Sequence, residues 1–241
     1  MKKYELTQNS IKINNRTLYQ IRTLKDFGSV KKGNLGGYIV SEKNLSHDGN
    51  CWVSGNAQVS ENARVYGNAE VYGKAQVSGN AQVSGNAWVY GKAQVSGNVR
   101  VSGNALVYEN ALVSENAMVS GNAQVYGKAQ VYGKAQVYGK ARVYGDTWVY
   151  GNASVYGNAQ VYGNARVSEN ARVSGNVHVY GNAQVSGNAR LGYIPIDFDC
   201  NFDPYKTLKE ILNCPEILPA LSGLNKNLDK LISTILTKTS T

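Results

Sequence analysis

Few side chains in this chain are suited to acid–base or metal chemistry. Its 241 residues include two histidines, His47 and His178, and three cysteines, Cys51, Cys200 and Cys214. A zinc centre with three histidine ligands and one open position is therefore excluded. His178 lies in a Val-His-Val stretch and would have to act alone as a general base, whereas a lone outward histidine is usually a surface residue. We expect no metal and no cofactor.

The cysteines also bear on the compartment. They are odd in number and form no Cys-x-x-Cys pair, which favours free thiols in a reducing environment. No signal peptide is evident, and no run of 18 apolar residues could span a membrane. We therefore expect a cytoplasmic protein, in a bacterial or phage-infected cell, without membrane association.

A glycine-rich stretch at residues 33–37, Gly-Asn-Leu-Gly-Gly, is a second place to look for ligand chemistry. It lacks the Gly-Lys-Ser/Thr ending of a phosphate-binding loop and is not set between a strand and a helix. A turn or cap role is the better interpretation.

Most of the chain is a short repeat, which contains Cys51 and His178. Residues 51–192 repeat the unit Ala-x-Val-[Ser/Tyr]-Gly-Asn about 24 times without insertion. Ala and Val are two apart, so both point to one side of an extended segment, while the residues beside Val point outward. Gly-Asn supplies the positive-φ conformations of a tight corner. Short strands alternating with corners predict an all-β solenoid.

The outward Ser/Tyr position indicates how many units form a coil. If three units form one turn, every eighteenth residue stacks, and seven of the twelve repeat tyrosines share one face: Tyr72, Tyr90, Tyr108, Tyr126, Tyr144, Tyr162 and Tyr180. An antiparallel meander with Gly-Asn hairpins predicts no such period and fits poorly with the Glu-Asn and Gly-Lys corners. We therefore expect a three-sided coil of about eight turns.

The pattern Val-x-x-x-Ala-x resembles the hexapeptide repeat of left-handed parallel β-helices. The stretches at residues 19–28, 33–38 and 44–52 resemble the leader of hexapeptide-repeat proteins of phages and prophages. The resemblance covers roughly residues 17–192 and implies a left-handed, three-sided β-helix. Some enzymes of this fold are acyltransferases, but they use a catalytic histidine and a protruding corner loop, and no loop interrupts the repeat here. Acyl transfer is the weakest alternative.

The segments around the repeat predict a three-part chain. Residues 1–50 should form a cap over the first coil, irregular apart from two short strands at 10–13 and 17–21. All four prolines follow the repeat, so residues 193–241 form a separate tail. Its apolar spacing predicts an amphipathic helix that caps the solenoid or joins chains, through Leu221, Leu224, Leu228, Leu231 and Ile235.

Three surface features are candidates for binding. The first is an apolar patch for self-association or a partner, formed by Trp88, Tyr90, Leu106, Tyr108 and Tyr126, with Trp52 on the same face. The second is an anion-binding cluster, with Arg172 and Arg190 on one face and Arg166 on an adjacent one. The third is a belt formed by one outwardly apolar coil (Leu106, Leu112 and Met118) and by lysines at three corners (Lys128, Lys134 and Lys140).

Charge permits an anionic partner without demanding one. The net charge is +9, made of +5 in residues 1–50, +5 in the repeat and −1 in the tail. We expect a non-enzymatic scaffold or binding protein that self-assembles, preferably as a trimer. The alternative is a sequestering or inhibitory protein for a small anionic, nucleotide-like ligand or a host defence factor. The positive charge also permits binding to nucleic acid, but no sequence motif supports it.

Overall fold

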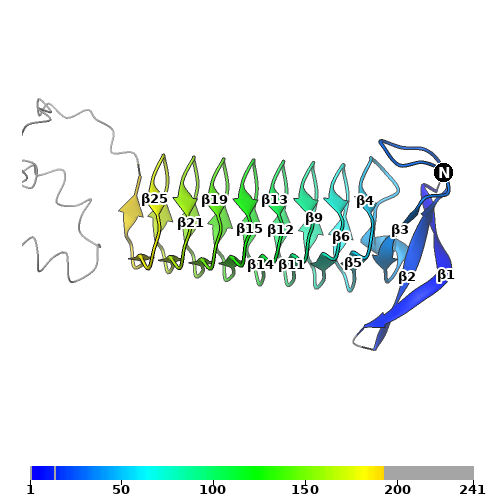
Figure 1. Ribbon diagram of the computed structural model, residues 1–241, viewed down its shortest axis with the longest axis horizontal. Helices are drawn as coiled ribbons and strands as arrows, with labels where there is room; N and C mark the ends of the chain where they lie inside the picture. Colours follow the sequence, from blue (N-terminus) through cyan, green and yellow to red (C-terminus); the bar gives the residue numbers. More distant parts are fainter. Residues whose placement is uncertain (1, 14, 193–241) are drawn as a thin grey trace, which may run out of the picture.

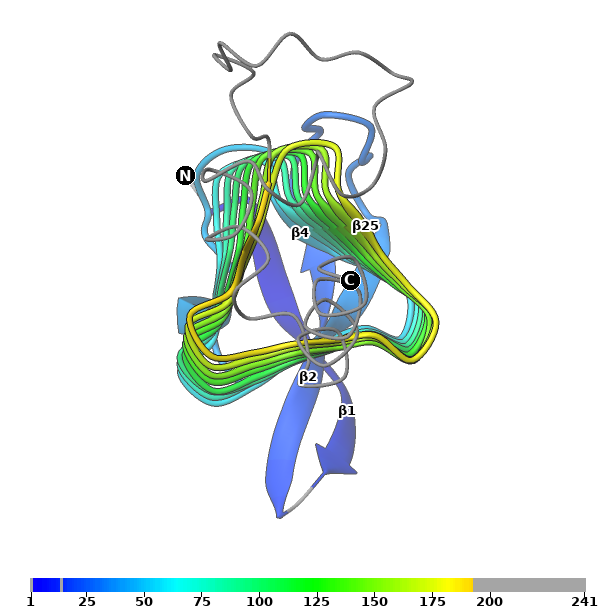
Figure 2. The same ribbon diagram turned by 90° about the vertical axis from the view of Figure 1, so that its left-hand side faces the viewer.

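Three parallel sheets run the length of the repeat in the computed structural model, which describes residues 2–13 and 15–192 (Figure 1). Each strand pairs with the strand eighteen residues further along, so three strands complete one turn. Seen along the axis, successive turns lie one behind another with a small, regular offset (Figure 2). The sheets of the repeat are parallel throughout, which excludes the antiparallel meander. The expected tail helix and its leucines lie outside the described residues.

The hairpin sheet contains the N-terminal hairpin and one strand from each turn. Its members outside the repeat are β1 (Tyr4–Ile13), β2 (Arg16–Thr23) and β3 (Leu35–Ile39). Within the repeat they are β5 (Gln58–Val59), β8 (Gln76–Val77), β11 (Gln94–Val95), β14 (Leu112–Val113), β17 (Gln130–Val131), β20 (Trp148–Val149), β23 (Arg166–Val167) and β26 (Gln184–Val185).

The other two sheets lie wholly within the repeat. The ladder sheet consists of β4 (Trp52–Val53), β7 (Glu70–Val71), β10 (Trp88–Val89), β13 (Leu106–Val107), β16 (Gln124–Val125), β19 (Arg142–Val143), β22 (Gln160–Val161) and β25 (His178–Val179). The arginine sheet consists of β6 (Arg64–Val65), β9 (Gln82–Val83), β12 (Arg100–Val101), β15 (Met118–Val119), β18 (Gln136–Val137), β21 (Ser154–Val155), β24 (Arg172–Val173) and β27 (Arg190–Leu191).

The core is a column of valine and alanine. Nearly every repeat Val and Ala is fully buried, as their two-residue spacing predicts. Thr147 replaces one Ala and is also buried, and its hydroxyl donates to the Tyr144 carbonyl at 2.6 Å. Each coil thus buries small apolar side chains in a narrow interior and contacts only its neighbouring coils.

Corners turn through a residue in the left-handed region. Glycine occupies most of these positions, with Gly79 at φ 69°, and four corners use glutamate instead, with Glu109 at φ 60°. The next residue donates its backbone N–H across coils, as from Asn56 to the Gly73 carbonyl at 2.8 Å. A Cβ added to Gly79 would lie 2.6 Å from the Gly97 nitrogen, so stacking as well as φ favours glycine there.

The N-terminal segment differs from the irregular cap predicted from sequence. β1 and β2 form an antiparallel hairpin longer than the two short strands expected. β3 pairs in parallel with β5, and Leu45 bridges to Val65, so residues 35–50 build one more turn of solenoid. The hairpin sheet consequently contains nine strands in parallel series from β3 to β26, and the solenoid has about nine turns rather than eight. The sequence missed this turn because its residues do not follow the repeat.

Candidate functional site

The seven ladder tyrosines form one continuous stack beside the ladder sheet. Adjacent ring centroids lie 4.7–5.5 Å apart, and the interplanar angles are between 1° and 15°. The spacing is set by the distance between strands, about 4.8 Å. Because each inner ring face is covered by the next ring, the stack presents ring edges and hydroxyls to solvent. A flat ligand could stack only on a terminal ring.

Packing of the stack changes the acidity of its phenols. Burial raises the pKa of Tyr108 to about 12, with a smaller contribution from the neighbouring tyrosines. Burial also raises the pKa of Tyr72, Tyr90, Tyr126 and Tyr144. These hydroxyls therefore stay protonated at neutral pH, and that of Tyr144 donates to Gln160 Oε1 at 3.3 Å.

An exposed apolar patch adjoins the stack. Trp88 is 42% exposed and pairs in register with Leu106, while its ring lies edge-on to Tyr72 at 6.3 Å. The structure thus brings the five predicted residues of this surface, which we call the aromatic face, to one sheet: Trp88, Tyr90, Leu106, Tyr108 and Tyr126.

Trp52 does not join the aromatic face, although its outward position predicted that it would. Only 6% of its surface is exposed, because the N-terminal segment packs over it. Phe27 meets its ring edge-on at 5.5 Å, and Tyr4 does so at 6.3 Å. The leader therefore ends the exposed part of this face.

The arginine cluster is divided between two sheets, as the eighteen-residue period predicts. Arg172 and Arg190 are register partners in the arginine sheet. Arg166 lies in the hairpin sheet, where its guanidinium packs over the Trp148 ring at 4.8 Å from the centroid. Among residues 2–13 and 15–192, none of these arginines forms an ion pair.

Asparagine ladders were missed by the sequence reasoning, although an asparagine at every eighteenth residue was the available signal. Along two corners, most Asn side chains donate from Nδ2 to the Asn Oδ1 of the next coil at 2.9–3.2 Å. The third corner has one such step, from Asn164 to Asn182 at 3.2 Å. Lys134 interrupts one ladder and Lys140 the other. The third corner lysine, Lys128, lies 3.8 Å from Asp146. Two of the three corner lysines of the predicted belt therefore lie at breaks in the amide stacking, and the belt itself stays a prediction.

A groove in the arginine sheet was also missed. Its volume is about 360 Å³, and it opens around Ser154 between Gln136 and Arg172. Seven consecutive repeats, from Tyr126 to Tyr162, carry tyrosine in the same part of the chain. A serine among glutamines and arginines was the sequence signal for this groove.

The two histidines occupy unrelated surroundings. His47 stacks on Tyr4 at 4.4 Å, and its Nδ1 accepts the Lys3 backbone N–H at 3.2 Å. His178 is exposed and edge-on to Tyr162 at 6.3 Å. Within the described part of the chain, no three His, Cys, Asp or Glu side chains are grouped as metal ligands would be.

A buried lysine anchors the N-terminal segment to the first turns. Lys3 Nζ donates to the Cys51 carbonyl at 2.9 Å, lies 3.3 Å from Cys51 Sγ and packs over Phe27. Burial lowers the pKa of Lys3 and raises that of Cys51, although each group partly offsets the shift of the other. This cluster acts as a clamp on the cap.

Comparison with known families agrees with this geometry. The YdcK beta solenoid repeat matches the chain in segments of about one turn each, at residues 57–73, 75–91, 93–109, 99–115, 135–151, 159–173, 165–181 and 171–187. This chain is a β-solenoid repeat protein. The matched segments all lie inside the repeat and together span less than half of the chain. No curated protein matches the sequence of this chain significantly. Across residues 2–13 and 15–192, no helix of the β-solenoid is long and apolar enough to cross a bilayer.

Proposed function

We propose that this β-solenoid is a non-enzymatic scaffold or binding protein that assembles with copies of itself, as a trimer, through the aromatic face. In this proposal the coils are left-handed and three-sided. The protein is of phage or prophage type and acts in the cytoplasm of a bacterial or phage-infected cell. The resemblance of its leader and repeat to such proteins supports that assignment.

The exposure of Trp88 beside Leu106 carries this proposal. A large apolar ring costs free energy when it stays in water, and exposed apolar patches on a regular surface are typical of interfaces. The tyrosine stack continues the patch along six strand spacings, or about 29 Å. A straight strip of that length suits contact with a second straight solenoid.

The rest of the surface supports a binding role over catalysis. His178, the candidate general base, packs edge-on to a tyrosine and has no carboxylate partner among the described residues. The groove described above lies on a different sheet from the aromatic face. Self-assembly and ligand binding can therefore be tested separately.

The test is the solution mass of the full chain by light scattering. Glutamine is the commonest outward residue of these strands, so Trp88→Gln with Leu106→Gln should preserve the coil while removing the patch. We expect the parent to be a trimer and this double variant to be a monomer.

The matched control is Leu112→Gln with Met118→Gln, which removes apolar residues from the other two sheets next to the Leu106 strand. It should remain trimeric. A trimer that survives the loss of Trp88 and Leu106 but dissociates when Leu224 and Leu228 are changed to Gln would assign assembly to the tail instead. A monomeric parent would refute the proposal.

A further inference from the structure

Ser154 is exceptional among the outward residues of the solenoid. Every other two-residue strand from β4 to β27 places Gln, Glu, Arg, His, Leu, Met or Trp at this position. Loss of one long side chain leaves a gap between the coils on either side. The groove of about 360 Å³ occupies that gap, and around Ser154 it is lined by Gln136, Tyr138, Asn152, Tyr156, Asn170 and Arg172.

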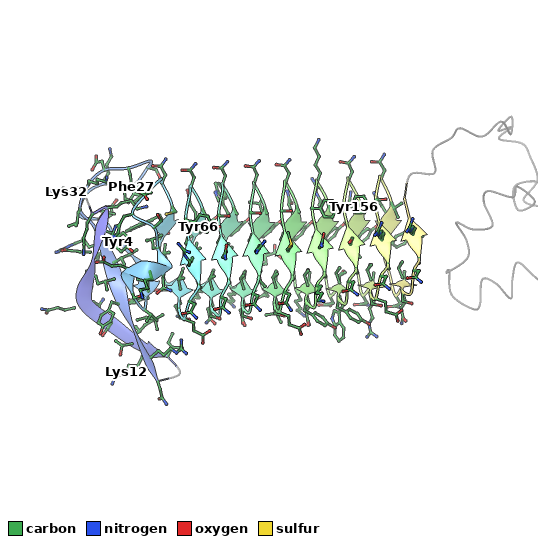
Figure 3. The ribbon with its side chains drawn as sticks, turned by 180° about the vertical axis from the view of Figure 1, so that it is seen from behind. Tyr4, Lys12, Phe27, Lys32, Tyr66 and Tyr156 are labelled. Atoms are coloured by element: carbon green, nitrogen blue, oxygen red, sulfur yellow. The ribbon has the colours of Figure 1, made fainter. Side chains whose placement is uncertain are left out.

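Two tyrosines form one side of the groove. Tyr138 and Tyr156 stack with centroids 4.9 Å apart and an interplanar angle of 1°. Their column continues with Ser120 on one side and Ser174 on the other, so this stack has only two rings. Unlike the inner rings of the seven-membered ladder, each ring has one face that no further tyrosine covers. Tyr156 is labelled on this side of the solenoid in Figure 3.

Amide groups form the opposite side. Asn152 Nδ2 donates to Asn170 Oδ1 at 3.1 Å. Because the preceding residue in this column is Lys134, Asn152 begins its ladder and its Oδ1 receives no amide hydrogen from that direction. Gln136 adds a third primary amide. The groove thus offers amide donors and acceptors that can pair with sugar hydroxyls.

The charge around the groove is positive. Arg172 lines it and Arg190 is the next residue in register, while Lys134 and Lys140 lie at the two ends of the β18 segment. Between Lys134 and Arg172 the acids are Asp146 and Glu169, and Glu169 precedes Asn170 at the corner. Arg172 forms no ion pair with the described residues, so its planar guanidinium can take a carboxylate or sulfate group.

Two observations argue against a phosphate cradle for a nucleotide. Backbone N–H groups, which such cradles use, are occupied in coil stacking here, as from Ser154 to the Ala171 carbonyl at 2.9 Å and from Asn152 to the Glu169 carbonyl at 2.7 Å. Apart from the two tyrosines the lining consists of amides, a hydroxyl and a guanidinium, so a base would meet no second apolar wall opposite the tyrosine rings. The volume lies at the small end of ligand pockets, which suits one sugar unit.

We propose that the Ser154 groove binds one unit of an acidic saccharide. Arg172 holds the carboxylate or sulfate group, the amides of Gln136 and Asn152 pair with ring hydroxyls, and an uncovered tyrosine face packs on the sugar C–H groups. This proposal does not depend on the aromatic face, because the groove belongs to the arginine sheet.

The test is retention of the full chain on an array of oligosaccharides that contain uronate or sulfate, with neutral oligosaccharides beside them. We expect retention on acidic glycans. Ser154→Gln fills the groove with the common residue of that position and should lower retention about tenfold or more. Arg172→Gln should abolish the preference for acidic over neutral glycans. Arg100→Gln, three turns before Ser154 in the same sheet, is the matched control and should bind as the parent does.

Circular dichroism of each variant establishes that the coil is intact, so loss of retention reports on the groove. Equal retention of the parent and Ser154→Gln would overturn the proposal, as would the absence of retention on every glycan. A thermal shift with adenosine monophosphate in a parent that retains no glycan would also overturn it and assign the groove to nucleotides. Absence of glycan binding would not contradict the proposed trimer, and a monomeric parent would not contradict glycan binding by the groove.

Discussion

Replacing Lys134 by asparagine should stabilise the solenoid by closing a gap in its amide ladder. Lys134 lies between Asn116 and Asn152 in a corner column whose other steps are Nδ2–Oδ1 hydrogen bonds of 2.9–3.2 Å. Lys134→Asn adds two such steps. Polar pairs on neighbouring strands contribute roughly 0.2–1 kcal/mol each, so the free energy of unfolding should rise by about 0.4–2 kcal/mol.

Urea unfolding, followed by circular dichroism, measures this change. Lys134→Gln removes the same positive charge but has the wrong length for the ladder, so it separates amide stacking from relief of charge repulsion. Asn98→Lys makes the reverse change, breaking steps of 2.9 and 3.1 Å, and should destabilise the protein by a similar amount. If Lys134→Asn and Lys134→Gln have the same stability, the ladder argument is wrong.

Three further outcomes follow from the described geometry. Gly79→Ala should destabilise the fold more than Gly55→Ala by urea unfolding, because both require positive φ but the added Cβ approaches backbone to 2.6 Å in the first and 3.2 Å in the second. Equal losses would mean that only φ matters. Burial raises the pKa of Tyr108 to about 12, whereas the phenol in the unfolded chain ionises near pH 10. The contribution of Tyr108 to stability is therefore present below pH 10 and is lost as the pH rises from about 10 to 12. Absorbance at 295 nm should show a late ionisation that Tyr108→Phe removes. Lys3→Met deprives the Cys51 carbonyl of its Nζ donor and should lower the free energy of unfolding by about 1–3 kcal/mol. Relative to the parent, hydrogen exchange should become faster in β1 and stay unchanged in β20; an equal acceleration in both strands would contradict a local clamp.

Much of the architecture could be predicted because the repeat encodes it redundantly. The Ala and Val spacing gave the buried face, Gly-Asn gave the corners, and the period of tyrosine gave the eighteen-residue register that pairs Trp88 with Leu106. Each inference rested on many copies of one residue pattern, so local exceptions such as Glu109 at a corner did not disturb it.

The leader was harder to predict because its contacts are not repeated. Leu45 bridges to Val65 from a segment that lacks the Ala-x-Val pattern, so the ninth turn left no periodic signal. Burial of Trp52 depends on Phe27, which folds over it from a loop. A single long-range contact of this kind cannot be inferred from spacing.

The groove escaped prediction for a different reason: it results from an absence. Ser154 is unremarkable as a residue, and its consequence appears only when its register partners Gln136 and Arg172 are placed beside it. In a repeat protein the consensus residues account for stacking, so a departure from consensus is the more informative signal about function.

The departures in this chain also have an identifiable physical cost. Lys134 and Lys140 each forgo two ladder hydrogen bonds, and both flank the strand that carries Gln136, next to the Ser154 groove. Lys134 and Lys140 lie next to the one truncated outward side chain and to an arginine that forms no ion pair among the described residues, whereas the other corner lysines of the repeat, Lys74, Lys92 and Lys128, occupy the third corner. Lys134→Asn should therefore raise stability and weaken acidic-glycan retention together. A variant that gains stability and retains glycans unchanged would show that the lysines are drift and that the groove acts through Arg172 alone.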